Sequence, residues 1–148
     1  MPDPYPRLTV VVPVRNEERY ISRTIEFLLN QDYPPDRVEI LVGVADSTDR
    51  TAHVVQEIAA REPRVKYFHN PHGLSSGART LGAKRAAGDI VLFVDGHVWI
   101  DNDQVFRNTA RLMEEKDVSV LSRPQLLDVV QQCFCSCFII TGFIRVPM

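Results

Sequence analysis

Residues 89–97, DIVLFVDGH, decide how the rest of the chain is interpreted. The apolar run from Ile90 to Val94 is uninterrupted, which is typical of a strand that is buried on both faces of a sheet. The run then ends in Asp95, Gly96 and His97. A carboxylate and an imidazole two positions apart can converge on one ligand when a glycine between them lets the chain turn. The stretch therefore predicts a buried strand that carries polar groups to the edge of a sheet.

Strand-like and helix-like segments alternate along the whole sequence. Strands are predicted over 8–12, 38–45, 65–68, 90–94 and 118–121, and helices over 17–29, 51–61, 75–87 and 103–115. Such alternation predicts parallel strands joined by crossover helices that cover both faces of the sheet. The expected fold class is therefore α/β, with a mostly parallel sheet sandwiched by helices.

Three polar turns follow predicted strands. They are PVRNE at 13–17, DSTD at 46–49 and DGH at 95–97. Ligands of parallel α/β sheets bind outside the carboxyl ends of the strands, so we expect the three turns to meet at one edge. A divalent cation prefers oxygen ligands and accepts imidazole, which makes Asp95 and His97 candidate metal ligands.

Composition excludes several classes of protein. The chain has 148 residues, 45% of them hydrophobic and 24% charged, as expected for one globular domain. A formal charge of -2 argues against general nucleic-acid binding, so no nucleic-acid partner is expected. No secretory leader is recognised, and no apolar run reaches the roughly 18–20 residues of a membrane span. We expect a cytoplasmic location.

The cysteines do not indicate a disulfide framework. All three, Cys133, Cys135 and Cys137, lie within five residues, and a structural zinc site would need a fourth ligand. We interpret them as buried thiols. The apolar segment 133–144 is too short for a membrane span. The alternatives are a core strand, a peripheral membrane contact, a homodimer contact, or the product of a truncated or altered reading frame.

Two nucleotide-binding motifs are absent. The turn after the first strand lacks the Gly-x-Gly-x-x-Gly of dinucleotide-binding enzymes, and GLSSGAR at 73–79 lacks the spacing and lysine of a P-loop. A sugar nucleotidyltransferase would carry its glycine-rich loop directly after the first strand. That class is kept only as an alternative.

Three stretches together resemble the family 2 glycosyltransferases, inverting enzymes of GT-A fold that transfer a sugar from a nucleotide-diphosphate donor. They are VVVPVRNEE at 10–18, VEILVGVADSTDRT at 38–51 and HGLSSGARTLGAKRAAGDIVLFVDGH at 72–97. The resemblance runs from about residue 7 to about residue 124. It implies a donor site, with UDP as the expected nucleotide and a divalent cation, Mn²⁺ or Mg²⁺, as cofactor.

The resemblance also implies which residues bind the donor and the cation. The implied donor-binding residues are Pro13, Arg15, Glu17, Asp46, Arg79 and Asp95, and the implied metal ligands are Asp95 and His97. Five of them have an alternative interpretation. Glu17 could interact with the dipole at the start of a helix, Asp46 could form an Asx turn, and Arg79 could be a solvated helix residue. Asp95 could cap the next segment, and His97 could be a surface turn residue.

The chain departs from the family pattern at three places. His97 stands where a second aspartate is usual, and Thr80 stands where asparagine is common. Val44 and Ala45 occupy positions that are often acidic, so Asp46 is taken as the acid that contacts the base.

The expected function is metal-dependent, inverting transfer of a sugar to an unknown glycan or lipid acceptor in cell-envelope polysaccharide synthesis, at the inner face of the membrane. Residues 1–124 are predicted to form the donor-binding domain, and 125–148 an apolar segment with no assigned role. Family catalytic domains are usually longer, and Asp128 is the one candidate base after residue 124. A nucleotide-sugar-binding domain without turnover is therefore the alternative.

Overall fold

The computed structural model describes residues 5–99, 101–115, 120–121 and 140–145. They form a six-stranded sheet with the strand order β3-β2-β1-β4-β6-β5. The strands are β1 (Leu8–Val14), β2 (Val38–Ala45), β3 (Val65–Asn70), β4 (Ile90–Val94), β5 (Val120–Leu121) and β6 (Ile140–Arg145). The helices are α1 (Ile21–Leu29), the 3-10 helix η1 (Pro35–Arg37), α2 (Thr51–Arg61), α3 (Ser75–Arg85) and α4 (Val105–Glu115).

Strand β1 lies at the centre of the parallel part of the sheet. It pairs with β2 from Leu8 opposite Val38 to Val14 opposite Val44, and with β4 from Leu8 opposite Ile90. Strand β3 continues the parallel array beyond β2, whereas β6 pairs antiparallel with both β4 and β5. The carboxyl ends of β1, β2, β3 and β4 therefore share one edge.

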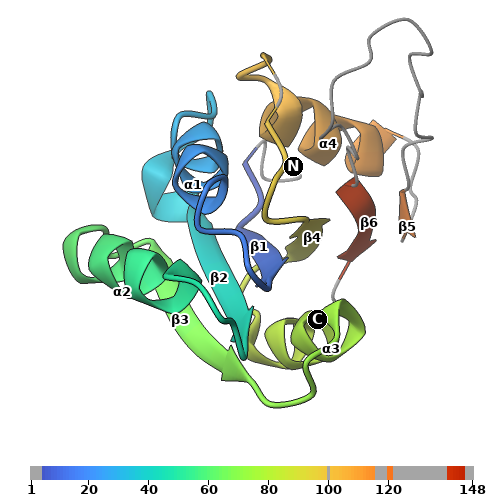
Figure 1. Ribbon diagram of the computed structural model, residues 1–148. Helices are drawn as coiled ribbons and strands as arrows, with labels where there is room; N and C mark the ends of the chain where they lie inside the picture. The colour runs from blue at the N-terminus through green and yellow to red at the C-terminus, as the bar shows by residue number, and fades with distance from the viewer. Residues whose placement is uncertain (1–4, 100, 116–119, 122–139, 146–148) are drawn as a thin grey trace, which may run out of the picture.

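Helices cover both faces of this sheet. Helices α1 and α4 lie on one side and α3 on the other (Figure 1). The larger apolar core packs α1, α2 and α4 against one face, around Val10, Val12, Ile25 and Phe106. The smaller one packs α3 against the other face, around Val11 and Phe93. The α/β class with a mostly parallel sheet is confirmed.

The elements match the predicted segments with shifts at their ends. Helix α1 begins at Ile21 rather than at residue 17, because residues 17–20 form a turn in which the Glu17 carbonyl accepts from the N–H groups of Tyr20 and Ile21. Helices α3 and α4 are each two residues shorter than predicted, and β3 is two residues longer. In the described parts of the chain, no helix is long and apolar enough to cross a membrane.

Strand β1 runs through Pro13, although the sequence predicts that it stops there. Pairing of β1 with β4 ends at Val11, so at Pro13 the strand has a neighbour only on the β2 side. A proline, which lacks an N–H group, is tolerated where a strand has lost one of its two partners.

Of the segment beyond residue 124, the structure describes Ile140–Arg145, which is strand β6. The part of 133–144 that lies in β6 is therefore a strand of the sheet, paired with β4 and β5. Asp128 and the three cysteines lie outside the described residues.

Helix α3 sits close to the sheet because glycines remove side chains at the contact. A Cβ atom on Gly82 would lie 2.4 Å from Val11 Cγ1 of β1, which no real contact allows. A Cβ atom on Gly43 of β2 would lie 2.9 Å from Ala78 Cβ of α3. The two contacts fix the height of α3 above the strands.

At the amino-terminal ends of the strands, side chains form a hydrogen-bond network around Glu39. Its Oε1 accepts from Thr9 Oγ1 at 2.6 Å and from the Ala87 N–H at 2.8 Å, and its Oε2 pairs with Lys66 Nζ at 2.9 Å. Burial alone would raise the pKa of the Glu39 carboxyl. The hydrogen bonds from Thr9, Ala87 and Lys66 outweigh that effect and hold the pKa below its ordinary value of 4.5.

We expect Glu39→Gln to lower the free energy of unfolding by about 1–3 kcal/mol at neutral pH, since hydrogen bonds to a charged acceptor are lost. Because the folded-state pKa of Glu39 is depressed, this stability is complete above the unfolded pKa and is lost as the pH falls through the folded value. Urea unfolding at a series of pH values checks this. Glu26→Gln, on the exposed face of α1, is the control; an equal loss for Glu39→Gln at low and neutral pH would contradict the prediction.

Candidate ligand-binding site

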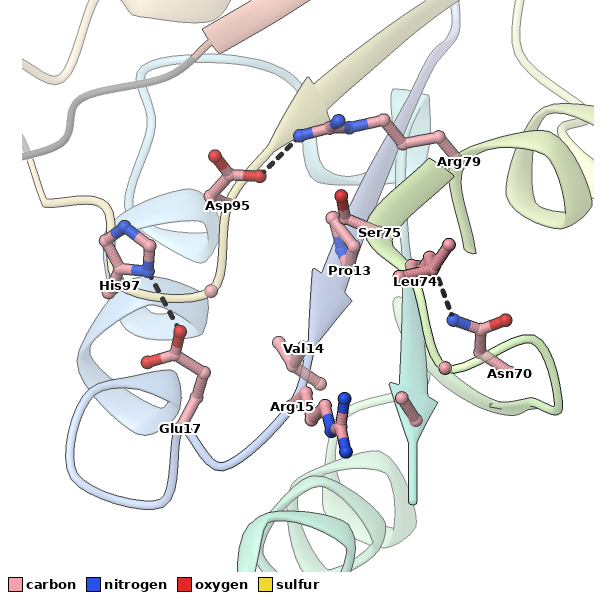
Figure 2. Close-up of a pocket in the computed structure, with 13 residues that line it drawn as sticks. Pro13, Val14, Arg15, Glu17, Asn70, Leu74, Ser75, Arg79, Asp95 and His97 are labelled. Atoms are coloured by element: carbon pink, nitrogen blue, oxygen red, sulfur yellow. Dashed lines mark hydrogen bonds and ion pairs between the residues drawn. The ribbon is translucent and has the colours of Figure 1, made fainter. Parts of the chain in front are cut away.

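A pocket of about 410 Å³ opens at the carboxyl edge of the parallel strands. Six of the residues singled out in the sequence line it, namely Pro13, Arg15, Glu17, Arg79, Asp95 and His97. Figure 2 shows Glu17, Asp95 and His97 along one wall and Leu74, Ser75 and Arg79 along the other, with Pro13 and Val14 between them. The turns after β1 and β4 therefore meet as the sequence predicts, together with the start of α3.

Arg79 crosses this pocket to reach Asp95. Its Nη2 donates to Asp95 Oδ1 at 2.7 Å, and the side chains are 27% and 13% exposed, respectively. The Nε of Arg79 is buried and has no hydrogen-bond partner in the described part of the chain. The guanidinium therefore keeps unused donor capacity at the pocket wall, which suits a ligand with oxygen acceptors.

His97 is paired with Glu17 on the same wall. The distance between His97 Nδ1 and Glu17 Oε1 is 2.9 Å, and the side chains are 28% and 20% exposed. One residue of the β4 turn thus contacts the turn after β1, although 80 positions separate them in sequence.

The pocket is lined by equal numbers of arginine and carboxylate side chains. Two arginines, Arg15 and Arg79, and two carboxylates, Glu17 and Asp95, line it. Arg15 is exposed and makes no ion pair with the part of the chain that the structure describes. A dianionic ligand would therefore need Arg79 to exchange partners, a cation to accompany it, or both.

The turns after β1 and β2 are fastened to each other by side chains that the sequence analysis did not single out. Asn16, with φ of 54°, donates its N–H to Ser47 Oγ and accepts from the Thr48 N–H at 2.8 Å. Glu18 Oε2 accepts from the Arg50 N–H at 2.7 Å. The signal for Asn16 was available, because asparagine is among the few residues that adopt a left-handed backbone.

Asp49 lies two residues before the start of helix α2 and bonds to its first residue. Its Oδ1 accepts from the Thr51 N–H at 3.0 Å, and its Oδ2 accepts from the Glu18 N–H at 3.2 Å. Desolvation would raise the pKa of the Asp49 carboxyl, but the hydrogen bonds from Thr51 and Glu18 hold it below its ordinary value. Asp49 is thus occupied in joining the turns rather than turned to a ligand.

Asn70 shapes the second wall and was also missed in the sequence. It is 2% exposed at the end of β3, donates Nδ2–H to the Leu74 carbonyl and accepts from the His72 N–H. With Gly73 at φ of 69°, these bonds turn the chain from β3 into α3. The sequence could have indicated this turn, because Asn70 ends an alternating strand and directly precedes Pro-His-Gly.

Asp46 stands apart from the other candidates. It follows β2 directly, yet its side chain is 91% exposed and it does not line the pocket, whereas Ala45 does. Its Oδ1 lies 3.0 Å from His69 Nε2. The structure thus places Asp46 at the rim rather than inside.

A metal would have two protein donors here. The described residues contain no cluster of three or more His, Cys, Asp or Glu side chains arranged to hold an ion. Asp95 and His97 nonetheless face the same pocket, and one carboxylate oxygen and one ring nitrogen are left after their internal bonds. Magnesium-like ions commonly use one or two protein ligands and complete their shell with phosphate oxygens and water, so the donor set fits.

Comparison with known proteins identifies the family. The family described as Glycosyl transferase family 2 matches residues 9–132. The chain belongs to glycosyl transferase family 2. Among relatives of this family 2 chain, poly(ribitol-phosphate) beta-N-acetylglucosaminyltransferase TarS of Staphylococcus aureus is 30% identical over 116 residues, 78% of this chain. Glycosyltransferase GlyA of Streptococcus pneumoniae is 30% identical over 115 residues, 77% of this chain.

Solved structures agree with this family 2 fold. A crystal structure of TarS 1–349 from S. aureus matches with a TM-score of 0.74 at 25% identity, covering 94% of this chain and 47% of that one. The mannosyltransferase PcManGT from Pyrobaculum calidifontis, in complex with GDP-Man and Mn²⁺, matches with a TM-score of 0.73 at 27% identity, covering 85% and 38%. The family 2 chain spans 20% of TarS and 16% of GlyA.

Gly96 lets the turn after β4 lie against β1. A Cβ atom there would lie 2.4 Å from Val14 Cγ1, and valine has little freedom to move. We expect Gly96→Ala to lower the free energy of unfolding by about 1–3 kcal/mol through overpacking. In a double-mutant cycle, Val14→Ala should remove much of that loss, because it removes the methyl group that clashes. Strictly additive effects in urea unfolding would show that the contact does not set the turn.

Proposed function

We propose that this chain forms the donor-binding part of a glycosyltransferase that transfers a sugar from a nucleotide-diphosphate donor, a UDP-sugar, to an acceptor hydroxyl. Membership of family 2 supports transfer of a sugar. The observation that carries the site assignment is the pocket where Arg79 and Asp95 face each other between the turns of β1 and β4. In this proposal Pro13, Arg15, Asp46, Arg79 and Asp95 contact the donor, while Glu17 lines the pocket beside His97.

The diphosphate is proposed to lie between the two walls. The Arg79 side chain is 27% exposed at the pocket, and phosphate oxygens could accept from the N–H groups of its planar guanidinium. Arg15 adds an exposed positive charge at the same pocket. When the diphosphate binds, Arg79 would exchange the Asp95 carboxylate for phosphate oxygens, and Asp95 would become available to a cation.

Asp95 and His97 are the residues proposed to hold a divalent cation, Mn²⁺ or Mg²⁺. When bound, the cation would supply positive charge to the leaving diphosphate. The charge balance of the pocket supports this role, because the protein by itself offers no net positive charge to a dianion. The mannosyltransferase from P. calidifontis was solved with Mn²⁺ and its donor.

The proposed reaction is one displacement at the anomeric carbon, with inversion. The acceptor oxygen forms a bond to that carbon while the bond to the diphosphate oxygen breaks, and the leaving nucleoside diphosphate takes the electron pair. A base removes the proton of the acceptor hydroxyl. Arg15 and Arg79 would stabilise the charge that develops on the leaving group. Asp128 is the candidate base, and it lies outside the described residues.

The remaining assignments extend this proposal to the whole protein. We propose residues 1–124 as the donor-binding domain and a glycan or lipid as acceptor. The relative TarS is named for a poly(ribitol-phosphate) acceptor, which supports a place in cell-envelope polysaccharide synthesis. UDP is proposed as the nucleotide, since the TarS structure with UDP-GlcNAc matches this chain with a TM-score of 0.72. A cytoplasmic location at the membrane surface, and a peripheral membrane or homodimer contact through residues 133–144, complete the proposal.

Calorimetric titration with UDP tests the cation. Affinity should be on the order of tenfold or more higher with Mn²⁺ than with EDTA, since a cation at a diphosphate contributes several kcal/mol of charge stabilisation. Asp95→Asn should remove this difference, and the chain should stay folded because the amide oxygen can still accept from Arg79. Titrations with GDP alongside test the choice of nucleotide. UDP affinity that is indifferent to EDTA would refute the metal assignment.

Asp46→Ala tests the proposed contact with the base or ribose. Loss of this acceptor should cost about 1–3 kcal/mol of UDP binding free energy, with little effect on stability because the side chain is exposed. His69→Ala is the matched control, since it removes the partner of Asp46 and leaves the carboxylate. Equal UDP affinity in Asp46→Ala and the wild type, at an unchanged melting temperature, would show that another residue contacts the base.

A further inference from the structure

We propose that Glu17 is a positioning residue, which holds the proton of His97 on Nδ1 and thereby offers Nε2 to the cation. The inference rests on the proposed function of the site. It assigns Glu17 a role different from the nucleoside contact that the sequence suggests, and it applies to this chain because the usual aspartate is replaced by His97.

The short contact between the two side chains sets the tautomer. Glu17 Oε1 lies 2.9 Å from His97 Nδ1. An ionised carboxylate only accepts hydrogen bonds, so Nδ1 must carry the hydrogen. In a neutral imidazole the other nitrogen then keeps its lone pair, which is the form that binds a metal. Among the described residues, none forms a hydrogen bond with His97 Nε2.

Glu17 is held in place by its backbone independently of any ligand. Its N–H donates to Thr51 Oγ1 at 2.8 Å, and its carbonyl accepts from the N–H groups of Tyr20 and Ile21, both at 2.9 Å. These bonds connect Glu17 to α2 and to the start of α1. A carboxylate on so constrained a backbone can orient an imidazole before the ligand arrives.

The His97 side of the pair is also anchored to α1. The Gly96 carbonyl accepts from Thr24 Oγ1 at 2.9 Å, and this bond is buried. The position that a Cβ of Gly96 would occupy is 3.4 Å from Glu17 Cγ, so the peptide before His97 lies against the Glu17 side chain. Both members of the pair are thus fixed to the same end of α1.

The nucleoside-contact alternative makes a different demand on Glu17. A nucleoside contact would contribute to UDP binding whether or not a cation is present. A positioning role would contribute only to binding of the cation, through His97. The dependence on Mn²⁺ therefore separates the two roles.

The first measurement is the tautomer of His97 in the ligand-free chain at neutral to mildly basic pH. Long-range ¹H–¹⁵N NMR correlations distinguish the two neutral forms, and a His97→Asn variant assigns the signal among the four histidines. We expect the Nδ1–H form in the wild type and in Glu17→Gln, whose amide oxygen can still accept. In Glu17→Ala, we expect a shift towards the Nε2–H form.

The second measurement is Mn²⁺ affinity at saturating UDP, from the electron paramagnetic resonance signal of free Mn²⁺. Glu17→Ala should weaken it by about 10- to 100-fold, the usual effect of losing the partner of a metal-binding histidine. Glu17→Gln should lose less of the Mn²⁺ affinity than Glu17→Ala. Glu18→Gln removes the same charge one residue away on an exposed side chain and should stay within about twofold of the wild type. UDP affinity measured in EDTA should be no lower in Glu17→Ala than in the wild type.

Three results would overturn the inference. They are an Nε2–H form of His97 in the wild type, Mn²⁺ affinity in Glu17→Ala equal to that of the wild type, and a loss of UDP affinity in Glu17→Ala that is the same with and without Mn²⁺. A wild-type chain that binds UDP but no Mn²⁺ would overturn the metal assignment and this inference together. A wild-type chain that binds Mn²⁺ and UDP but shows no dependence on Glu17 would overturn this inference alone.

Discussion

The burial of β1 between two parallel neighbours is the constraint on which the site depends. All seven residues of β1 are buried, with β2 on one side, β4 on the other and helices against both faces. No polar group can be accommodated along such a strand without a partner, so chemistry is confined to the turns at its ends. Parallel pairing then brings the turns of β1 and β4 to the same edge, with the start of α3 opposite them.

The partly buried charged groups of the pocket are paired with one another, whereas Arg15 is exposed. Arg79 with Asp95 and Glu17 with His97 leave no partly buried charge alone among these four residues. An unpaired charge in such a place is costly, while a pair that is partly exposed contributes modestly to stability. Binding of a charged ligand is therefore an exchange of partners rather than the filling of an empty site.

Much of this arrangement follows from the sequence, and the exceptions have physical causes. The order of elements, the shared edge and the pocket positions of Asp95 and His97 follow from periodicity and strand ends. The pocket position of Arg79 was expected from the family resemblance. The continuation of β1 through Pro13 depends on where pairing with β4 stops, which no local pattern records. The pairing of Glu17 with His97 joins residues far apart in the chain, and the rim position of Asp46 depends on how the turn folds beyond Ala45.

The glycine contact between α3 and β1 has a consequence for how the family 2 chain can change over evolution. Gly82 rests on Val11, and Arg79 lies one turn earlier on the same helix. A larger residue at either core position would lift the helix and carry the guanidinium away from Asp95. If Arg79 binds phosphate as proposed, that contact depends on the core as well as on the pocket, and Val11 and Gly82 are expected to vary together among relatives of this chain.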